Sequence, residues 1–214
     1  KATFVCSNRL SNKLKGIHPL IEVDDVQYAV AVLSNIFYRS YNRDEISLFN
    51  EPKIDKSSEI SKTATIERGS VIGKNVKISD GCVIGYNCII GDDVFVDKNT
   101  VITNSIIAEK VKIGRNASIG QEGFGFAINK KENINIYHCG RVILQAGVKI
   151  GSNCTIDRGS FGDTVIGENS FFDNLCHVAH NVVVGNNCIF AAMSGIAGST
   201  NIGDYVMAGG QTGI

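Results

Sequence analysis

The stretch Val165–Ile214 reads VIGENSFFDNLCHVAHNVVVGNNCIFAAMSGIAGSTNIGDYVMAGGQTGI, and an apolar residue returns in it at every sixth position. The repeated residues are Ile166, Phe172, Val178, Val184, Phe190, Ile196, Ile202, Ala208 and Ile214. A period of six differs from the 3.6 of a helix and the 2 of a single strand, and it indicates a short extended segment followed by a turn. The stretch therefore predicts a solenoid.

The same period runs back through most of the chain. It is carried by Ile54, Ile60, Ile66, Ile72, Ile78, Ile84, Ile90, Val96 and Ile102, then by Ile107, Ile113 and Ile119, and again by Leu144, Ile150 and Ile156. Because about 18 residues make three hexads, we expect about eight coils of an all-β solenoid in residues 51–214. Residues 121–143 and the segment from Asp157 to Ile166 interrupt the count and are expected to be inserted loops.

The residue after each apolar position is often Gly, and Asn or Asp follows two residues later, as in Gly73-Lys74-Asn75 and Gly151-Ser152-Asn153. Gly, Asn and Asp tolerate the left-handed backbone that a sharp corner needs. Each hexad is therefore expected to form one flat face and one corner, with the middle corner residue in solvent. Ala179-His180-Asn181 occupies one such corner.

Composition limits the classes of function. The 21 basic and 21 acidic residues cancel, so the sequence offers no basic field for nucleic acid, and we expect no nucleic-acid partner. No run of 18 apolar residues occurs, so no membrane span is expected. Five of the seven cysteines lie two residues before a repeated apolar residue, where they should point into the core. With no CxxC pair, the sequence favours a reducing compartment and a cytoplasmic protein.

Residues 1–50 lack the period and predict a small, partial α/β domain and a linker. Residues 2–6 predict a strand, and Asp24 or Asp25 is placed to cap a helix carrying Val26, Val30, Leu33 and Phe37 on one face. A polar linker is expected from Tyr38 to Lys53. We also expect the chain to be part of a longer protein, because it starts without Met and stops in the middle of the repeat.

Four histidines are the first candidates for chemistry. His18 and His138 are expected at the surface, and His177 is expected to point outward from a flat face and pack against a neighbouring subunit. His180 occupies the middle of a corner, where an imidazole with a pKa near 6.5 is a ready general base. No motif places a Ser, Cys or Lys nucleophile beside it, so direct attack by a substrate group is the simpler chemistry.

A series of motifs adds a family resemblance. The series is Gly123-Phe124-Gly125-Phe126, Gly140-Arg141-Val142, Thr155-Ile156-Asp157-Arg158-Gly159, Asp173-Asn174, Ala179-His180-Asn181-Val182 and Gly195-Ile196-Ala197-Gly198-Ser199-Thr200. In this order it resembles the UDP-3-O-acyl-glucosamine N-acyltransferases of lipid A biosynthesis, within the hexapeptide-repeat acyltransferases.

The resemblance implies a left-handed parallel β-helix that assembles as a homotrimer with active sites between subunits. It implies transfer of a 3-hydroxyacyl chain from the phosphopantetheine of acyl carrier protein to the 2-amino group of UDP-3-O-acyl-glucosamine, without a cofactor or metal. His180 matches the catalytic base, and Asp173 and Asn174 match substrate-binding positions. It also implies a uridine-binding-type domain at residues 1–50, with its contacts upstream of Lys1, and a second functional histidine beyond Ile214.

Spacing adds two expectations about the site. Gly198 follows His180 by 18 residues without an insertion, so it should lie at the same corner one coil further on. Its amide is our candidate oxyanion donor. Asn174 lies one hexad before His180, and a face of five extended residues spans about 16 Å, so the two can meet only across a subunit interface.

Three alternatives remain open. One is an O-acyltransferase of the same fold that acts on a UDP-sugar. Another is a zinc-dependent carbonic anhydrase-like β-helix, which needs three converging imidazoles where His177 and His180 provide two. The last is an inactive structural solenoid. Association is favoured in any case by apolar residues at outward positions, namely Val71, Val83, Ile89, Phe95 and Val101.

Overall fold

The structure, a computed structural model, describes residues 3–38, 48–128 and 132–214. The chain forms two compact units. Unit 1 is Lys1–Ser40 with Gly125–His138, and unit 2 is Tyr41–Phe124 with Cys139–Ile214. Most of the expected linker, residues 39–47, lies outside the described residues.

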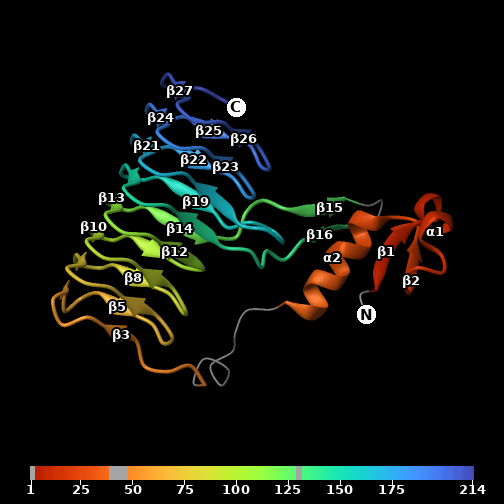
Figure 1. Cartoon of the computed structure of the whole chain (residues 1–214), viewed down its shortest axis with the longest axis horizontal. Helices are drawn as coiled ribbons and strands as arrows, with labels where there is room; N and C mark the ends of the chain where they lie inside the picture. Colours follow the sequence, from red (N-terminus) through yellow and green to blue (C-terminus); the bar gives the residue numbers. More distant parts are fainter. Residues whose placement is uncertain (1–2, 39–47, 129–131) are drawn as a thin grey trace. The chain divides into compact units, whose positions relative to one another are not determined.

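Unit 2 is a solenoid in which each coil contributes one short strand to each of three parallel sheets, here called faces 1, 2 and 3 (Figure 1). Face 1 contains β3 (Lys53–Ile54), β6 (Val71–Ile72), β9 (Ile89–Ile90), β12 (Ser105–Ile107), β17 (Val142–Leu144), β20 (Thr164–Ile166), β23 (Val183–Val184) and β26 (Asn201–Ile202). Face 2 contains β4 (Glu59–Ile60), β7 (Lys77–Ile78), β10 (Phe95–Val96), β13 (Lys112–Ile113), β18 (Lys149–Ile150), β21 (Phe171–Phe172), β24 (Ile189–Phe190) and β27 (Met207–Ala208). Face 3 contains β5 (Thr65–Ile66), β8 (Val83–Ile84), β11 (Val101–Ile102), β14 (Ser118–Gln121), β19 (Thr155–Asp157), β22 (His177–Val178) and β25 (Gly195–Ile196). Faces of eight, eight and seven strands among the described residues agree with the expected eight coils.

The repeated apolar residues form one continuous core along the solenoid. Ile84, Ile102 and Phe190 are among the fully buried side chains, and Phe172 stacks on Phe190 with ring centroids 4.6 Å apart. The five cysteines expected to point inward, Cys82, Cys88, Cys154, Cys176 and Cys188, are all buried. Burial raises the pKa of the Cys88 and Cys154 thiols to about 11, which keeps them protonated as small core groups.

The corners need their two special residues for different reasons. The Asn or Asp has the left-handed backbone, as in Asn75 with φ 54° and Asn153 with φ 57°. The Gly two positions earlier does not, contrary to the expectation that Gly also supplies left-handed backbone. It is required because a Cβ on Gly114 would lie 2.8 Å from the backbone carbon of Gly151 in the next coil, closer than packed atoms approach.

Unit 1 contains β1 (Phe4–Ser7), α1 (Asn8–Leu14), β2 (Leu20–Val23), α2 (Val26–Phe37) and an antiparallel hairpin of β15 (Phe126–Ile128) and β16 (Asn133–Asn135). β1 and β2 pair in parallel. The expected helix cap is confirmed at Asp25, whose carboxylate accepts a hydrogen bond from the Tyr28 N–H at 2.9 Å. The expected apolar face is wrong in part, because α2 buries Ala31 and Ser34 and leaves Phe37 exposed. Among the described residues, no helix is both long and apolar enough to cross a membrane.

The insertion at residues 121–143 supplies the hairpin of unit 1. Polar side chains of α2 hold the hairpin backbone: Ser34 Oγ accepts from the Tyr137 N–H at 2.9 Å, and Asn35 Nδ2 donates to Asn135 O at 2.7 Å. His138, expected at the surface, is 1% exposed, and its Nδ1 lies 3.0 Å from Ile136 O. It is buried because it closes this hairpin under Gly125, where an added Cβ would meet the ring at 2.7 Å.

Two neighbouring isoleucines test the inward ladder. Ile90 is 1% exposed and Ile89, on the same strand, is 45% exposed. We expect Ile90→Ala to lower the free energy of unfolding by about 2–5 kcal/mol through lost burial and a residual cavity. Ile89→Ala should lower it by less than about 1 kcal/mol.

Chemical denaturation measured at two protein concentrations provides the check. A loss at Ile89 that shrinks on dilution would report association through face 1 instead of packing within the chain, because association stabilises the folded state less at lower protein concentration. Equal losses for both variants at both concentrations would contradict the inward ladder.

Candidate active site

His180 lies at the corner that follows β22, which we call the His180 corner (residues 179–181). Val178 fixes the corner from the inside, because it is buried in the core ladder. Asn181 makes the turn with a left-handed backbone, φ 60°. β22 pairs in register with β25, so Val178 lies opposite Ile196. The corner of the next coil, at residues 197–199, therefore lies directly beside His180.

Gly198 lies against the imidazole, as its 18-residue spacing predicts. A Cβ on Gly198 would lie 2.8 Å from His180 Nε2 and 2.9 Å from Cε1, so any larger residue would displace the ring. The Ser199 N–H donates to His180 O at 2.8 Å and closes the corner. The Gly198 N–H makes no hydrogen bond to another described residue.

The second insertion determines which nitrogen of His180 carries the proton. Asn181 Oδ1 accepts from the Ser160 N–H at 2.9 Å, and Asn181 Nδ2 lies 3.3 Å from Gly162 O, which together orient the amide. His180 Nδ1 lies 3.1 Å from the same Oδ1. Because a carbonyl oxygen only accepts, Nδ1 carries the hydrogen in the neutral ring, and Nε2 presents a lone pair. Nε2 is also the ring atom nearest to the position that a Cβ on Gly198 would take.

A cavity of about 570 Å³ opens in front of this corner. It is lined by Phe124, Asp157, His177, Ala179, His180, Gly195, Ile196, Ala197, Gly198, Gly213 and Ile214. Small and apolar residues make up most of the wall, and Phe124 stands 82% exposed at one side. A largely apolar cavity with a few polar groups is the usual form of a small-molecule site.

Asp157 brings a carboxylate into the same cavity. It ends β19 in the coil before His180 and is only 5% exposed. Gln121 Nε2 donates to Asp157 Oδ1 at 2.6 Å, and Asp157 Oδ2 lies 3.8 Å from His177 Nε2. Burial raises the pKa of the Asp157 carboxyl, while the attraction of His177, the Gln121 hydrogen bond and the attraction of His180 act in the opposite direction.

His177 points outward from face 3, as the sequence predicts, and it also lines the cavity. Its Nδ1 lies 2.7 Å from Thr155 Oγ1 on the neighbouring strand β19. His177 and His180 are thus two imidazoles at one cavity. Among the residues that the structure describes, no group of three or more His, Cys, Asp or Glu side chains has the arrangement of a metal site.

Asp173 and Asn174 lie at a different corner, which follows β21 on face 2. Asn174 Oδ1 accepts from the Ser152 N–H at 2.8 Å, and Asp173 Oδ1 accepts from the Asn174 N–H at 2.7 Å. Neither residue lines the cavity of His180. Within one chain, the structure therefore brings Gly198 to His180 but does not bring Asn174 there.

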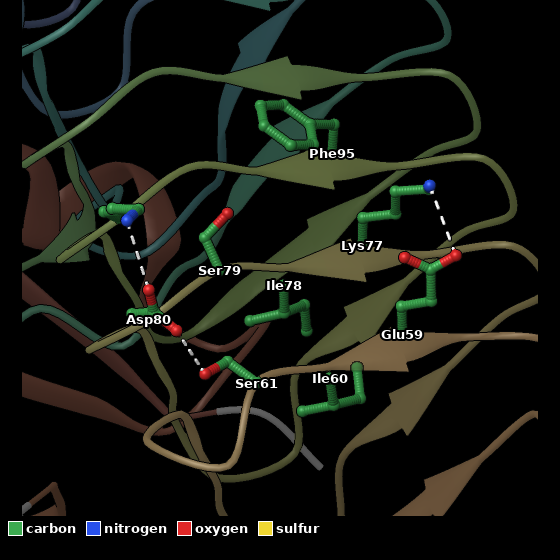
Figure 2. Close-up of a pocket in the computed structure, with 9 residues that line it drawn as sticks. Glu59, Ile60, Ser61, Lys77, Ile78, Ser79, Asp80 and Phe95 are labelled. Carbon is green, nitrogen blue, oxygen red and sulfur yellow. Dashed lines mark hydrogen bonds and ion pairs between the residues drawn. The ribbon is translucent and has the colours of Figure 1, made fainter.

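A second cavity, of about 440 Å³, lies over β4, β7 and β10. Its charged side chains pair with one another: Lys77 Nζ lies 3.2 Å from Glu59, and Asp80 accepts from Ser61 at 2.6 Å and lies 3.2 Å from Lys98 (Figure 2). Such half-exposed pairs contribute little energy and are already satisfied. The hydrogen bond from Ser61 and the contact with Lys98 lower the pKa of Asp80, as expected for a carboxylate that is already paired. We therefore place the chemistry at His180.

The sequence motifs that contain Asp157, Asn181 and Phe124 predict no role for these three residues at the site. Asp157 had one signal, since it occupies the position after the apolar residue where other hexads have Gly. Asn181 had none, because Asn at that position is the ordinary corner residue. Phe124 lies in the insertion at residues 121–143. The six-residue spacing does not continue through an insertion, so it cannot predict which coil Phe124 lies beside.

Two protein-family models match parts of the chain. The bacterial transferase hexapeptide model (six repeats) matches residues 163–198, and the GMPPB C-terminal domain model matches residues 49–140. Curated relatives include the UDP-3-O-acylglucosamine N-acyltransferase of Caulobacter sp. (strain K31), 54% identical over 49% of this chain and 31% of that protein. The enzyme of the same name from Methylobacterium nodulans is 52% identical over 46% of this chain and 28% of that protein.

Solved structures share the solenoid. UDP-N-acetylglucosamine acyltransferase from Campylobacter jejuni has a TM-score of 0.64 and 27% identity, over 72% of this chain and 59% of that chain. The UDP-N-acetylglucosamine O-acyltransferase of Moraxella catarrhalis has a TM-score of 0.54 and 30% identity, over 75% of this chain and 59% of that chain. The resemblance to hexapeptide-repeat acyltransferases is thus confirmed, and the matched stretches span less than a third of the curated relatives' length.

The tautomer of His180 can be tested without an activity assay. Asn181→Gly keeps a residue that tolerates the left-handed backbone but removes the amide that accepts from Nδ1. We expect ¹⁵N shifts of the His180 ring to report a protonated Nδ1 in the native protein and a mixture of tautomers in the variant. Asn187→Gly, at a corner with φ 57°, is the matched control and should leave the ring shifts unchanged. An Nε2-protonated ring in the native protein would refute the assignment.

Proposed function

We propose that this chain carries the catalytic solenoid of a UDP-3-O-acyl-glucosamine N-acyltransferase of lipid A biosynthesis. The acyl donor is a 3-hydroxyacyl chain on the phosphopantetheine of acyl carrier protein, and the acceptor is the 2-amino group of the sugar nucleotide. The observation that carries the proposal is His180, whose unprotonated Nε2 lies against Gly198 at an apolar cavity. Identity above 50% to proteins of that name supports the substrate class. A cytoplasmic location is part of the proposal.

His180 acts in this reaction as the general base. The sugar amine attacks the thioester carbonyl carbon, and His180 Nε2 takes the proton that the nitrogen loses. Asn181 Oδ1 holds the opposite nitrogen through the Nδ1–H, so that it also stabilises the imidazolium that forms. The imidazolium then returns the proton to the sulfur as the carbon–sulfur bond breaks.

The Gly198 N–H is our candidate donor to the oxyanion. This N–H belongs to the corner beside His180 and donates no hydrogen bond to another described residue. It can therefore donate to the negative charge that develops on the thioester oxygen. A donor about 2.7–3.1 Å from the oxyanion commonly contributes about 3 kcal/mol to the barrier. The absence of a side chain at this position leaves room for the thioester beside the imidazole.

Asp173 and Asn174 enter the proposal through assembly. Their corner is separate from the cavity within one chain, so a homotrimer would have to bring Asn174 of one subunit to His180 of the next. Outward apolar residues support association, since Val71, Ile89 and Val101 are exposed in the isolated chain. The hand of the coil, left-handed in the proposed family, remains part of the same expectation.

An O-acyltransferase is the second candidate, because the solved structures with similar coils are UDP-N-acetylglucosamine acyltransferases. Acceptors that carry either a free 2-amino group or a free 3-hydroxyl separate the two functions. We expect transfer to the amine, and exclusive transfer to the 3-hydroxyl would overturn the proposal.

A glutamine tests the base. We expect His180→Gln to lower kcat by about 10²–10⁴-fold, because glutamine has no basic nitrogen to accept the proton. Glutamine is chosen because it keeps a polar side chain at this position. His18→Gln is the control, since His18 is an exposed residue packed on Phe4 in unit 1. Steady-state acyl transfer and circular dichroism provide the readouts, and full activity of folded His180→Gln would end the proposal for this residue.

Mixed assemblies test the shared site. Light scattering should give a trimer at micromolar concentration, and His180→Gln and Asn174→Ala should each be inactive alone. Subunits mixed at equal amounts should recover about a quarter of the native sites, because a site is whole only when an intact His180 meets an intact Asn174 on the next subunit. A stable monomer, or no recovery in verified mixed trimers, would contradict sharing.

A further inference from the structure

The cavity in front of His180 has one acidic side chain in its wall. Among its described lining residues, Asp157 is the one acidic side chain, and none is Lys or Arg. The remaining wall is imidazole, backbone or apolar. The Asp157 carboxylate therefore lies in surroundings of low polarity, where a charge acts strongly on its neighbours.

One oxygen of the Asp157 carboxylate accepts a hydrogen bond within the protein, and the other does not. Oδ1 accepts from Gln121 Nε2 at 2.6 Å, and Ser118 Oγ donates to Gln121 Oε1 at 2.8 Å, so the glutamine amide is itself oriented. Oδ2 faces His177 Nε2 at 3.8 Å, which is longer than a hydrogen bond, and it makes no hydrogen bond to any described residue. A side chain that is 5% exposed and presents an open oxygen to a cavity indicates a ligand that donates there.

We propose that Asp157 selects an amine as the acyl acceptor, by accepting a hydrogen bond from the acceptor's ammonium group at Oδ2. This inference rests on the proposed acyl transfer at His180. The titratable groups facing the carboxylate are His177 on β22 and His180 at the next corner. None of the described residues that line the cavity is Lys or Arg, so no fixed cation competes for Oδ2.

The charge of the acceptor makes the selection. An amine with a pKa of about 8 is largely protonated at neutral pH, and a charge-assisted hydrogen bond is roughly twice as strong as a neutral one. A hydroxyl at the same place gains only the weaker bond. The buried carboxylate therefore concentrates the amine form of a sugar and gives little help to its hydroxyl analogue.

The reaction balances with this role. The ammonium held at Asp157 releases one proton to water, and the neutral amine then forms the nitrogen–carbon bond to the thioester. The second proton passes to His180 Nε2 and on to the sulfur as the carbon–sulfur bond breaks. The products are the amide, the thiol and one released proton, and no oxidant or reductant is needed.

The experiment compares two acceptors in the full protein. The first is UDP-3-O-acyl-glucosamine, and the second is the analogue with a 2-hydroxyl in place of the 2-amino group. We expect Asp157→Asn to lower kcat/KM for the amine by about 10- to 100-fold, the loss of one charged hydrogen bond, and to change the hydroxyl rate by less than about threefold. Asp157→Asn could also alter His180, but such a change would affect both acceptors equally. The ratio of kcat/KM for the amine to kcat/KM for the hydroxyl therefore reports selection alone.

Two control variants define the comparison. Asp204→Asn removes a carboxylate at another corner, where Asp204 Oδ1 accepts from the Asn186 N–H at 2.7 Å, and it should leave the ratio unchanged. His177→Gln removes the imidazole beside Asp157 and should keep the amine preference. Equal loss of preference in His177→Gln would overturn the proposal, because the carboxylate would then act only through His177.

Binding gives a readout that is independent of catalysis. Calorimetry with each acceptor, in the absence of donor, should show a preference for the amine in the native protein that Asp157→Asn loses while its melting temperature stays close to native. A folded Asp157→Asn protein that keeps the amine preference in binding and rate would refute the selection by Asp157. A native protein that binds the amine acceptor but transfers no acyl group would instead refute the proposed function.

Discussion

Hydrogen bonds between the backbones of successive coils are the constraint on which the rest of this protein depends. The His177 N–H donates to Ser194 O at 2.9 Å, and the Ala179 N–H donates to Ile196 O at 3.0 Å, so each strand is held to the same position of the next coil. This register turns a repeat of six in the sequence into columns of residues in space. The buried column supplies the core, and the corner columns supply the site.

The candidate site is built from three successive coils at one edge of face 3. The first coil contributes Asp157, the second His180 and the third Gly198. Each group is placed by a buried neighbour in the core ladder, and a side chain fixed on a rigid scaffold loses little further freedom when substrate binds. The stability of the coil and the geometry of the site therefore share the same contacts.

The chemistry is concentrated where the repeat departs from its own rule. At ordinary corners a side chain of one coil accepts a hydrogen bond from the backbone of its neighbour, as Asp92 Oδ1 does from the Lys74 N–H at 2.7 Å. Gly198 has no side chain to serve in this way, and the space is taken by the imidazole of His180. The insertion after Asp157 likewise replaces a simple corner, and its Ser160 and Gly162 orient the Asn181 amide that fixes the tautomer.

The sequence by itself determined the solenoid, its number of coils, the inward cysteines and the stacking of Gly198 on His180. These follow from a fixed period, because register between parallel strands depends only on counting residues. The tertiary structure alone decided what depends on insertions and on neighbouring coils. It buried His138, joined the β15–β16 pair to α2, and brought Asp157 to within 3.8 Å of His177. Insertions break the count, so the contacts of Asp157 and the orientation of Asn181 depend on packing between coils that no local pattern records.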